Sequence, residues 1–314
     1  MISRHESLLA NVAVLYYRDG LNQSEIAKRM GVSRATIVSY LRQARELQIV
    51  DIRISGMSFA TSRLASSLKE RFGLADVFIA EPGEASAIGE DDRLHHVATV
   101  GAMALLDILQ PNDVLGVSWG RTIHMLSEEL PIQKIPGLTI CQVVGSMHVP
   151  SLTAAEACAI RISGKTDAAC FTLHAPAIVS TPELAEALRS EGVIRRQLER
   201  FKTINRVLFS VGGCDDDTQL LQSGIGRVED LQWYTARGAK GIVCGRFIDG
   251  EGRHLVGPLD KRMIGITPDE LRACSGILVA AGREKVTAIR AALAGGLVSH
   301  LVVDLEIGSL LLAT

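Results

Sequence analysis

The first fifty or so residues carry apolar positions at the spacing of short α-helices. Two breaks, at Asn22 and at residues 31–33, leave three helical stretches between residues 6 and 54. The apolar stripe of the first stretch comprises Leu8, Val12, Leu15 and Tyr16. The pattern therefore predicts a small, purely helical unit at the start of the chain.

Beyond residue 56, short apolar runs alternate with longer amphipathic segments. The runs lie at residues 77–80, 114–117, 139–144, 171–173, 206–211, 241–243, 277–280 and 301–303. They are continuously apolar, as expected of strands that are covered on both faces. Helical spacing recurs between them, for example over residues 94–108 and 286–293. The fold class predicted for this body is α/β, with a mainly parallel, Rossmann-like sheet that binds ligands at the carboxyl ends of its strands.

A small polar segment at residues 55–58 predicts a hinge, so we place a domain boundary near residue 56 and expect domains at residues 1–55 and 56–314. The 314-residue chain has a formal net charge of −2, which by itself indicates no nucleic-acid partner. However, residues 1–55 hold eight Lys and Arg against five Asp and Glu, a net charge of +3. A mildly basic small domain on an acidic body is typical of DNA binding by one module.

A helix-turn-helix is predicted for residues 23–42. Ala27 is small enough for two helices to cross closely, and Gly31 stands where a helix end favours a positive φ. Asn22 begins an N-x-x-E capping signal for the first helix, and Ser33 caps the second. The predicted shared core comprises Ile26, Met30, Val32, Ile37 and Leu41. The structural alternative is a helical hairpin that serves only packing or oligomerisation.

The second helix of the pair is expected to enter the major groove of double-stranded operator DNA. Its outward positions, which are the candidates for contacts to base edges, are Arg34, Ala35, Val38, Ser39 and Arg42. Arginine makes bidentate contacts to guanine, and small apolar side chains contact the methyl group of thymine. The candidates for phosphate contacts, which position the protein without reading sequence, are Gln23, Lys28, Ser33 and Thr36.

The body carries the motifs GVSWGRT, GRFIDGEG and AAGREKVTAIRAALAGGLVSHLVVD. With the helix-turn-helix, they make the chain resemble the SorC family of sugar-binding transcriptional regulators, some of which are called DeoR-type, over nearly its whole length. The resemblance implies a body with the fold of ribose-phosphate isomerase and glucosamine-phosphate deaminase. It also implies a phosphorylated sugar or polyol as allosteric effector, no cofactor, and a homo-oligomer, commonly a tetramer. The sequence does not distinguish an activator from a repressor.

The loop Ser118-Trp119-Gly120-Arg121-Thr122 joins a predicted strand to a predicted helix. Free backbone N–H groups and the positive helix end would face an anion there, supported by the guanidinium of Arg121 and the hydroxyls of Ser118 and Thr122. The family uses this loop in its effector site, which agrees with that interpretation. A strand-to-helix turn that needs glycine only for packing is the alternative.

Three further loops are expected to converge on the same edge of the sheet, and they contribute Gly145, Ser146, Gly212, Gly213, Gly282 and Lys285. Lys285 matches the lysine of the family's GG-x-x-K pattern, with Ala281 in place of the first glycine, and would pair with a phosphate. Asp249 in GRFIDGEG matches a family aspartate and would accept hydrogen bonds from sugar hydroxyls. For each of these, a solvated loop residue is the alternative.

Other patterns exclude several functions. The sequence SGKT at residues 163–166 lacks the earlier glycine of a P-loop, so nucleotide hydrolysis is not expected. The adjacent His95 and His96 cannot face one metal ion. Residues 215–217 are interpreted as a solvated acidic turn, with a divalent-ion site as the alternative, so no metal site is expected. The six cysteines are scattered and interpreted as buried free thiols. No apolar run reaches the ~18 residues of a membrane span and no secretion signal is evident, so we expect a cytoplasmic location.

The main rival function is a sugar-phosphate isomerase or deaminase that carries a helix-turn-helix. Such chemistry needs a general base near the sugar carbonyl, for which Asp249, Asp304 and His148 are the nominees. No sequence feature assembles them into an acid-base set, so we expect no catalytic residues and no enzyme. A third possibility is a DNA-organising protein, which would show no response to any ligand.

Overall fold

The chain forms two compact units, residues 1–55 and 56–314, and each is described here by itself. A computed structural model describes residues 4–47, 49–50, 63–81, 89–147, 154–214 and 227–313. The expected hinge at residues 55–58, the nominated base His148 and the acidic turn at residues 215–217 lie outside the described residues.

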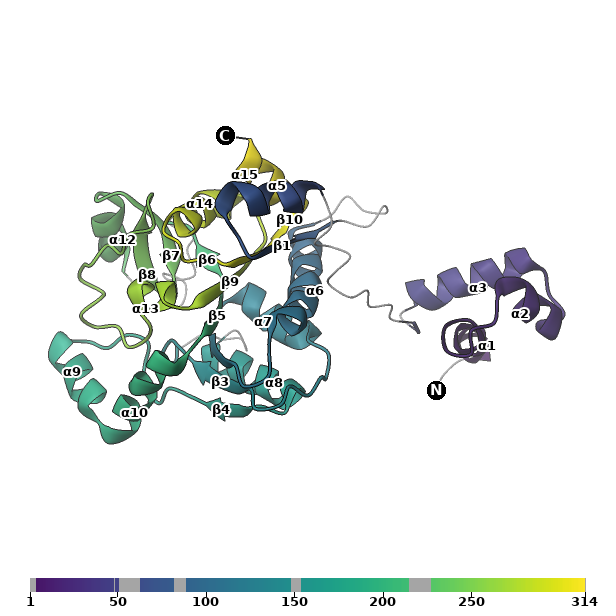
Figure 1. The fold of residues 1–314 in the computed structure, drawn as a ribbon, viewed down its shortest axis with the longest axis horizontal. Coiled ribbons are helices and arrows are strands. Elements are labelled where there is room, and N and C mark those ends of the chain that lie inside the picture. The colour runs from purple at the N-terminus through teal and green to yellow at the C-terminus, as the bar shows by residue number, and fades with distance from the viewer. Residues whose placement is uncertain are drawn as a thin grey trace. The chain divides into compact units, whose positions relative to one another are not determined.

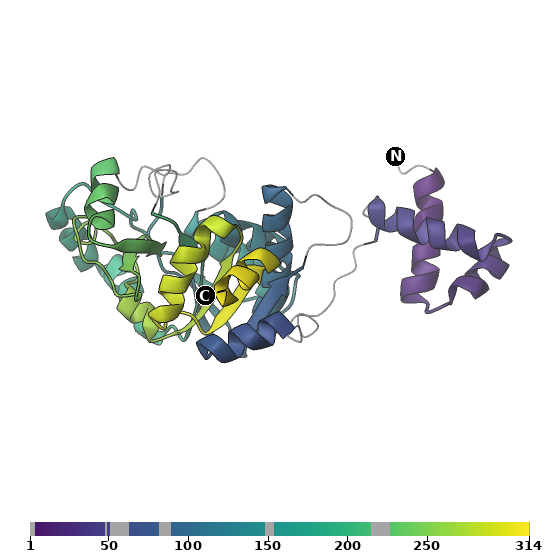
Figure 2. The ribbon, with the colours of Figure 1, turned by 90° about the horizontal axis from the view of Figure 1, so that it is seen from above.

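The described part of the first unit contains three helical stretches, as predicted. They are α1 (Arg4–Ala13), which a π-helical turn (Val14–Arg18) extends, α2 (Gln23–Met30) and α3 (Arg34–Glu46). Figure 2 shows α3 lying across α1. The side chain of Asn22 accepts hydrogen bonds from the backbone of the first turn of α2, and Gly31 ends that helix at φ 68°. The Oγ of Ser33 accepts the N–H of Thr36 at 3.0 Å and starts α3.

The core of this unit forms where the three helices meet. Its fully buried residues are Val12, Ile26, Ala27, Ile37 and Leu41, and Met30 and Val32 pack against them partly buried. In α1, Leu9 is fully buried, whereas Leu8 is half-buried, and Leu9 forms a second buried cluster with Ala13 and Ala44. These buried side chains fix which face of α3 points outward.

The body is organised around a parallel sheet. Among the described residues, seven strands run in the order β1-β10-β9-β5-β2-β3-β4, and every pairing is parallel. The strands are β1 (Asp76–Ala80), β2 (Val114–Val117), β3 (Thr139–Gln142), β4 (Ala169–Phe171), β5 (Arg206–Phe209), β9 (Ser275–Ala280) and β10 (His300–Asp304). The predicted α/β class with a mainly parallel sheet is thereby confirmed.

Helices cover both faces of this sheet (Figure 1). One face carries α6 (Glu90–Ile108), α7 (Arg121–Glu129) and α8 (Ala155–Thr166), and the other carries α5 (Arg63–Phe72) and α15 (Leu305–Leu312), with α14 (Val286–Ala294) beside α15. In β1, Val77 and Ile79 join one hydrophobic cluster, whereas Phe78 and Ala80 join another. Burial on both faces explains why the strands are continuously apolar. The remaining described helices are α9 (Pro182–Ser190), α10 (Gly192–Arg200), α12 (Val228–Thr235) and α13 (Pro268–Arg272).

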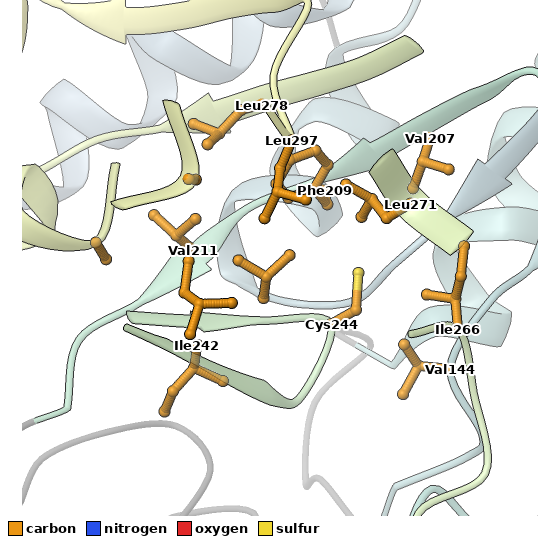
Figure 3. Close-up of a cluster of buried hydrophobic side chains, with 14 of the residues drawn as sticks. Val144, Val207, Phe209, Val211, Ile242, Cys244, Ile266, Leu271, Leu278 and Leu297 are labelled. Atoms are coloured by element: carbon orange, nitrogen blue, oxygen red, sulfur yellow. The ribbon is translucent and has the colours of Figure 1, made fainter. Parts of the chain in front are cut away.

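A second, antiparallel sheet accompanies the parallel one, and it contains one of the predicted strands. It contains β6 (Val211–Gly212), β7 (Ala239–Val243) and β8 (Arg246–Asp249). The run at residues 241–243 therefore belongs to a hairpin, because Cys244 and Gly245 both adopt a positive φ and return the chain at once. Figure 3 shows Val211 and Ile242 of this sheet in one hydrophobic cluster with Val207 and Leu278 of the parallel sheet.

The fourth strand also begins two residues earlier than the apolar run at 171–173 indicated. Leu173 is buried although it lies outside the strand. Its backbone N–H donates to the side-chain oxygen of Gln142 at 2.8 Å instead of to a neighbouring strand. The thiols of Cys141, Cys158 and Cys244 are buried, as predicted, whereas Cys170, Cys214 and Cys274 are only half-buried.

Two Gly→Ala substitutions test the packing of the body, and they are expected to change the free energy of unfolding in opposite directions. A Cβ on Gly276 in β9 would lie 1.9 Å from the carbonyl oxygen of Leu297, so we expect Gly276→Ala to lower the free energy of unfolding by about 3 kcal/mol. A Cβ on Gly164 in α8 would meet no atom within 4 Å, so Gly164→Ala should raise the free energy of unfolding by about 1 kcal/mol. Urea unfolding followed by circular dichroism measures both, and wild-type stability of Gly276→Ala would contradict the close approach.

Candidate functional site

A cavity of about 440 Å³ opens at the carboxyl ends of β9, β5 and β2, which are neighbours in the sheet. Its walls come from the loop after each of these strands, from the first turn of α6 and from the hairpin turn at Gly245. Nine of the twelve residues predicted for the effector site line it, namely Ser118, Trp119, Gly120, Arg121, Thr122, Gly212, Gly213, Gly282 and Lys285. The sheet order explains this convergence, because loops that follow adjacent parallel strands emerge at one edge.

The first turn of α7 provides one wall of the cavity. Gly120 precedes the helix at φ 124°, a conformation that side chains disfavour, and no side chain of the described residues caps the helix. The N–H groups of the first turn are thus available to a ligand, at the end of the helix where the dipole favours negative charge. Ser118 and Thr122 are buried beside this turn. The arrangement is suited to an anion.

Arg121 is already engaged by two carboxylates from the first turn of α6. Its Nη2 lies 2.8 Å from Oδ1 of Asp91, and its Nη1 lies 3.6 Å from Oε1 of Glu90. Both acidic side chains are exposed, so solvent screens these ion pairs. An anion that enters the cavity would therefore compete with Glu90 and Asp91 for this guanidinium.

The side-chain amine of Lys285 forms no hydrogen bond or ion pair with the part of the chain that the structure describes, although its backbone N–H donates to the carbonyl of Gly282. It ends a short 3₁₀ turn (Arg283–Lys285) that leads into α14. Burial lowers the pKa of its amine below the ordinary value of a lysine, and the positive charge of Arg121 lowers the pKa further, against the opposing effect of Glu284. A largely desolvated ammonium without a counter-ion is costly, and a bound anion removes that cost.

Gly282 and Asp304 shape the loop that carries Lys285. Gly282 adopts φ 99° and donates its N–H to Oδ2 of Asp304 at 3.0 Å. Asp304 also accepts the N–H of Ile307 at 2.8 Å and so caps α15. Its carboxylate is therefore engaged in structure, which removes one of the three nominated general bases.

Three predicted site residues lie away from the cavity. Gly145 and Ser146 follow β3, which lies beyond β2 in the sheet, and a Cβ on Gly145 would lie 2.6 Å from the backbone of Ala175 and Ala177. Gly145 thus permits close packing of two backbone segments. Asp249 ends β8 at the opposite end of the hairpin from Gly245. Its carboxylate accepts hydrogen bonds from the backbone N–H groups of Glu251 and Arg253 and from the Nε–H of Arg253 at 2.8 Å, so it stabilises a turn.

Sequence reasoning missed other residues of the cavity. Ser210 lines the cavity, and its buried Oγ has no hydrogen-bond partner among the described residues. Its position directly after β5 is the signal that could have identified it. Cys244 also lines the cavity, and burial raises the pKa of its thiol to about 11, so the thiol stays protonated. Glu90 comes from a helix that precedes every predicted loop, and no local pattern indicates its position.

The outer face of α3 carries the predicted base-reading residues. Arg34, Ala35, Val38 and Arg42 are exposed, while Ile37 and Leu41 point into the core. Ser39 is half-buried, and its Oγ accepts a hydrogen bond from Nε2 of Gln43 at 3.1 Å. Of the phosphate candidates, Lys28 and Ser33 are exposed, and Gln23 and Thr36 are half-buried. The Oγ of Ser33 is also 2.8 Å from the Oγ1 of Thr36, so these two hydroxyls serve the helix start.

The described part of the chain shows no group of three His, Cys, Asp or Glu side chains able to hold a metal ion, and no helix long and apolar enough to cross a membrane. The SGKT sequence forms the end of α8, outside the cavity, where Oγ1 of Thr166 donates to the carbonyl of Ile162. His95 lies 3.8 Å from Glu129, and the Nδ1 of His96 is buried.

The fold and cavity thus define a helix-turn-helix joined to a ligand-binding α/β body, and known proteins share both parts. Residues 58–313 match the family described as "Putative sugar-binding domain". The chain is 36% identical to the transcriptional regulator YjhU of Escherichia coli K12, covering 95% of this chain and 92% of that protein. It is 29% identical to the sorbitol operon regulator of Klebsiella pneumoniae, covering 97% of each.

Solved structures agree with these relatives. The full-length sorbitol operon regulator SorC from Klebsiella pneumoniae superimposes with a TM-score of 0.85 at 25% identity, over 98% of this chain and 99% of that one. The chain belongs to the SorC/DeoR-type family of sugar-binding transcriptional regulators. These relatives are transcriptional regulators, and the chain matches them over nearly their whole length. It is therefore a transcriptional regulator and not an enzyme.

Proposed function

We propose that this protein controls a carbohydrate or polyol catabolic operon by binding double-stranded operator DNA through α3, and that a phosphorylated sugar or polyol in the cavity regulates this binding. The observation that carries the proposal is that the first turn of α7 and Lys285, a cation that forms no ion pair among the described residues, line the same cavity. Together they supply backbone donors and a positive charge for a phosphate. Ser118 and Ser210 provide hydroxyls for the remainder of the ligand.

Relatives support a carbohydrate-derived effector. One is a sorbitol operon regulator, and another, 27% identical over 95% of this chain, is the deoxyribonucleoside regulator of Bacillus subtilis. Both names refer to molecules with several hydroxyl groups, which a cavity lined with serines and backbone N–H groups suits. Phosphorylation of the effector rests on Lys285 and the first turn of α7 alone.

Regulation requires two states that bind the effector with different affinity, because a ligand shifts an equilibrium only by that difference. We infer that the protein acts in the cytoplasm as a homo-oligomer, with a tetramer as the working stoichiometry. Two or more helix-turn-helix units would then span repeated half-sites of the operator.

Fluorescence anisotropy on DNA from upstream of the protein's own gene tests the proposal. The titration is repeated with a panel of free and phosphorylated sugars and polyols. Tight, salt-dependent binding that one phosphorylated compound shifts is the expected result. Specific binding that no compound shifts would contradict effector control, and a free sugar that acts as strongly as its phosphate would contradict the anion site.

Neutralising the acids that hold Arg121 should strengthen effector binding. In a Glu90→Gln/Asp91→Asn variant the guanidinium no longer has competing carboxylates, so the half-effective concentration of the effector should fall about 5-fold, the scale of exposed ion pairs. Asp92→Asn on the same helix turn is the control, because Asp92 forms no ion pair with Arg121. Unchanged sensitivity in the double variant would show that Arg121 stays with α6 when the effector binds.

A further inference from the structure

A side-chain contact joins the two helices of the helix-turn-helix at their first residues. The Nε of Arg34, the first residue of α3, donates to Oε1 of Gln23, the first residue of α2, at 3.2 Å. Both helix starts are fixed by caps, at Asn22 and at Ser33. The contact therefore links two rigid positions that lie eleven residues apart in the sequence.

The chemistry of the contact leaves defined groups available for DNA. With Nε occupied, the Nη1 and Nη2 groups of Arg34 form the edge that can donate two parallel hydrogen bonds to O6 and N7 of guanine. The amide nitrogen of Gln23 keeps two hydrogens with which to contact a phosphate. Arg34 begins α3, and the first residues of a recognition helix lie closest to base edges.

The contact with Gln23 affects the conformational freedom of the Arg34 side chain. Arginine loses much rotamer entropy when it binds, and a partner that holds Nε before DNA arrives restricts the guanidinium plane in advance. Within the described residues, no ion pair involves Arg34, so Gln23 is its polar partner there. We propose that Gln23 is a positioning residue that sets the orientation in which Arg34 reads guanine, and that it thereby determines operator specificity. This inference rests on the proposed DNA-binding function.

The test compares sequence preference rather than affinity alone. Full-length wild-type protein is first used to select a consensus from randomised double-stranded DNA, and anisotropy then measures binding to all four bases at each consensus position. The variants are Gln23→Met, Arg34→Met and the double variant, because methionine keeps side-chain length and helix propensity without the hydrogen bond. Lys28→Met is the matched control, an exposed residue of α2.

Arg34→Met should abolish the preference for guanine at one position of each half-site, and Gln23→Met should reduce the same preference by about 3-fold, which is part of the discrimination that a bidentate contact provides. In the double variant Gln23→Met should add nothing to the preference lost with Arg34→Met. Lys28→Met should weaken binding equally for all sequences.

Three results would overturn the proposal. Uniform weakening by Gln23→Met at unchanged preference would make Gln23 a phosphate contact only. Persistence of all guanine preferences in Arg34→Met would remove Arg34 as a base reader. Failure of the wild-type protein to select any sequence would refute the proposed DNA-binding function itself and the inference with it, whereas the first two results leave that function standing.

Discussion

Replacing Lys285 with methionine is expected to weaken the binding of a phosphorylated effector strongly while DNA binding stays intact. The side chain of Lys285 forms no ion pair within the described residues, so its ammonium is available to the ligand. A hydrogen bond between charged groups contributes about 1.5–3 kcal/mol, so effector affinity should fall by roughly 10- to 150-fold. Titration of the protein–DNA complex with the effector, followed by anisotropy, measures the change.

Arg283→Met is the matched control for this experiment. Arg283 is two residues away, its side chain is 71% exposed, and it lies 3.7 Å from Glu306, so its loss should change effector affinity less than about 3-fold. An equal loss of effector affinity in both variants would indicate long-range attraction by the positive charges of the loop and not a direct contact with Lys285.

The pH dependence of effector binding separates Lys285 from the other cations. Because burial lowers the pKa of its amine, the charged form is lost as pH rises through a value below that of an ordinary lysine, and anion affinity should fall with it. Lys285→Arg should bind the effector with less dependence on alkaline pH, since a guanidinium stays protonated. Identical pH profiles for the two proteins would assign the anion to other groups.

Removal of the Asp260 carboxylate is expected to produce the largest loss of stability in the body. Asp260 accepts hydrogen bonds from Nη1 of Arg246 at 2.8 Å, from the hydroxyl of Tyr234 at 2.6 Å and from the backbone of Gly257 at 2.7 Å. Asp260→Ala would leave the guanidinium of Arg246, which is 5% exposed, without its counter-charge. We expect the free energy of unfolding to fall by about 3–5 kcal/mol, measured by urea denaturation.

Asp269→Ala is the control, because the exposed ion pair of Asp269 with Arg272 should contribute less than about 1 kcal/mol. Burial alone would raise the pKa of Asp260, but hydrogen bonds from His254, Tyr234 and Arg246 outweigh burial and lower it. The stabilisation is therefore present above the pKa of an unfolded aspartate and is lost as pH falls through the lower folded value. The deficit of Asp260→Ala should accordingly be constant between about pH 5 and 7.

The sequence indicated most of the fold because burial on two faces leaves a strong local pattern. The run at residues 114–117 coincides with β2, and the helical spacing at 94–108 lies within α6. The hairpin of β7 and β8 was missed since its turn depends on Cys244 in a positive-φ conformation, which cysteine rarely adopts. Antiparallel and parallel strands of three to five apolar residues carry the same pattern, so periodicity cannot distinguish them.

The candidate site was predictable where it follows from strand ends and unpredictable where it depends on packing between distant elements. Trp119 and Gly282 each come within two residues of a strand end, and both line the cavity. The pairing of Arg121 with Asp91 joins α7 to α6 across thirty residues, and only the packing of those helices brings the two side chains together. For the same reason Asp249 was assigned to the site from its motif, although the hairpin carries it to the opposite end.

Loops and helix starts line most of the cavity, whereas both faces of the parallel sheet are buried under hydrophobic side chains. Substitutions in these loops can therefore change which ligand the cavity prefers without repacking the hydrophobic core. Grafting residues 118–122 and 281–285 from a relative that responds to a different molecule is the corresponding engineering route. The same separation makes this body a modular scaffold for biosensors whose recognition can evolve faster than its architecture.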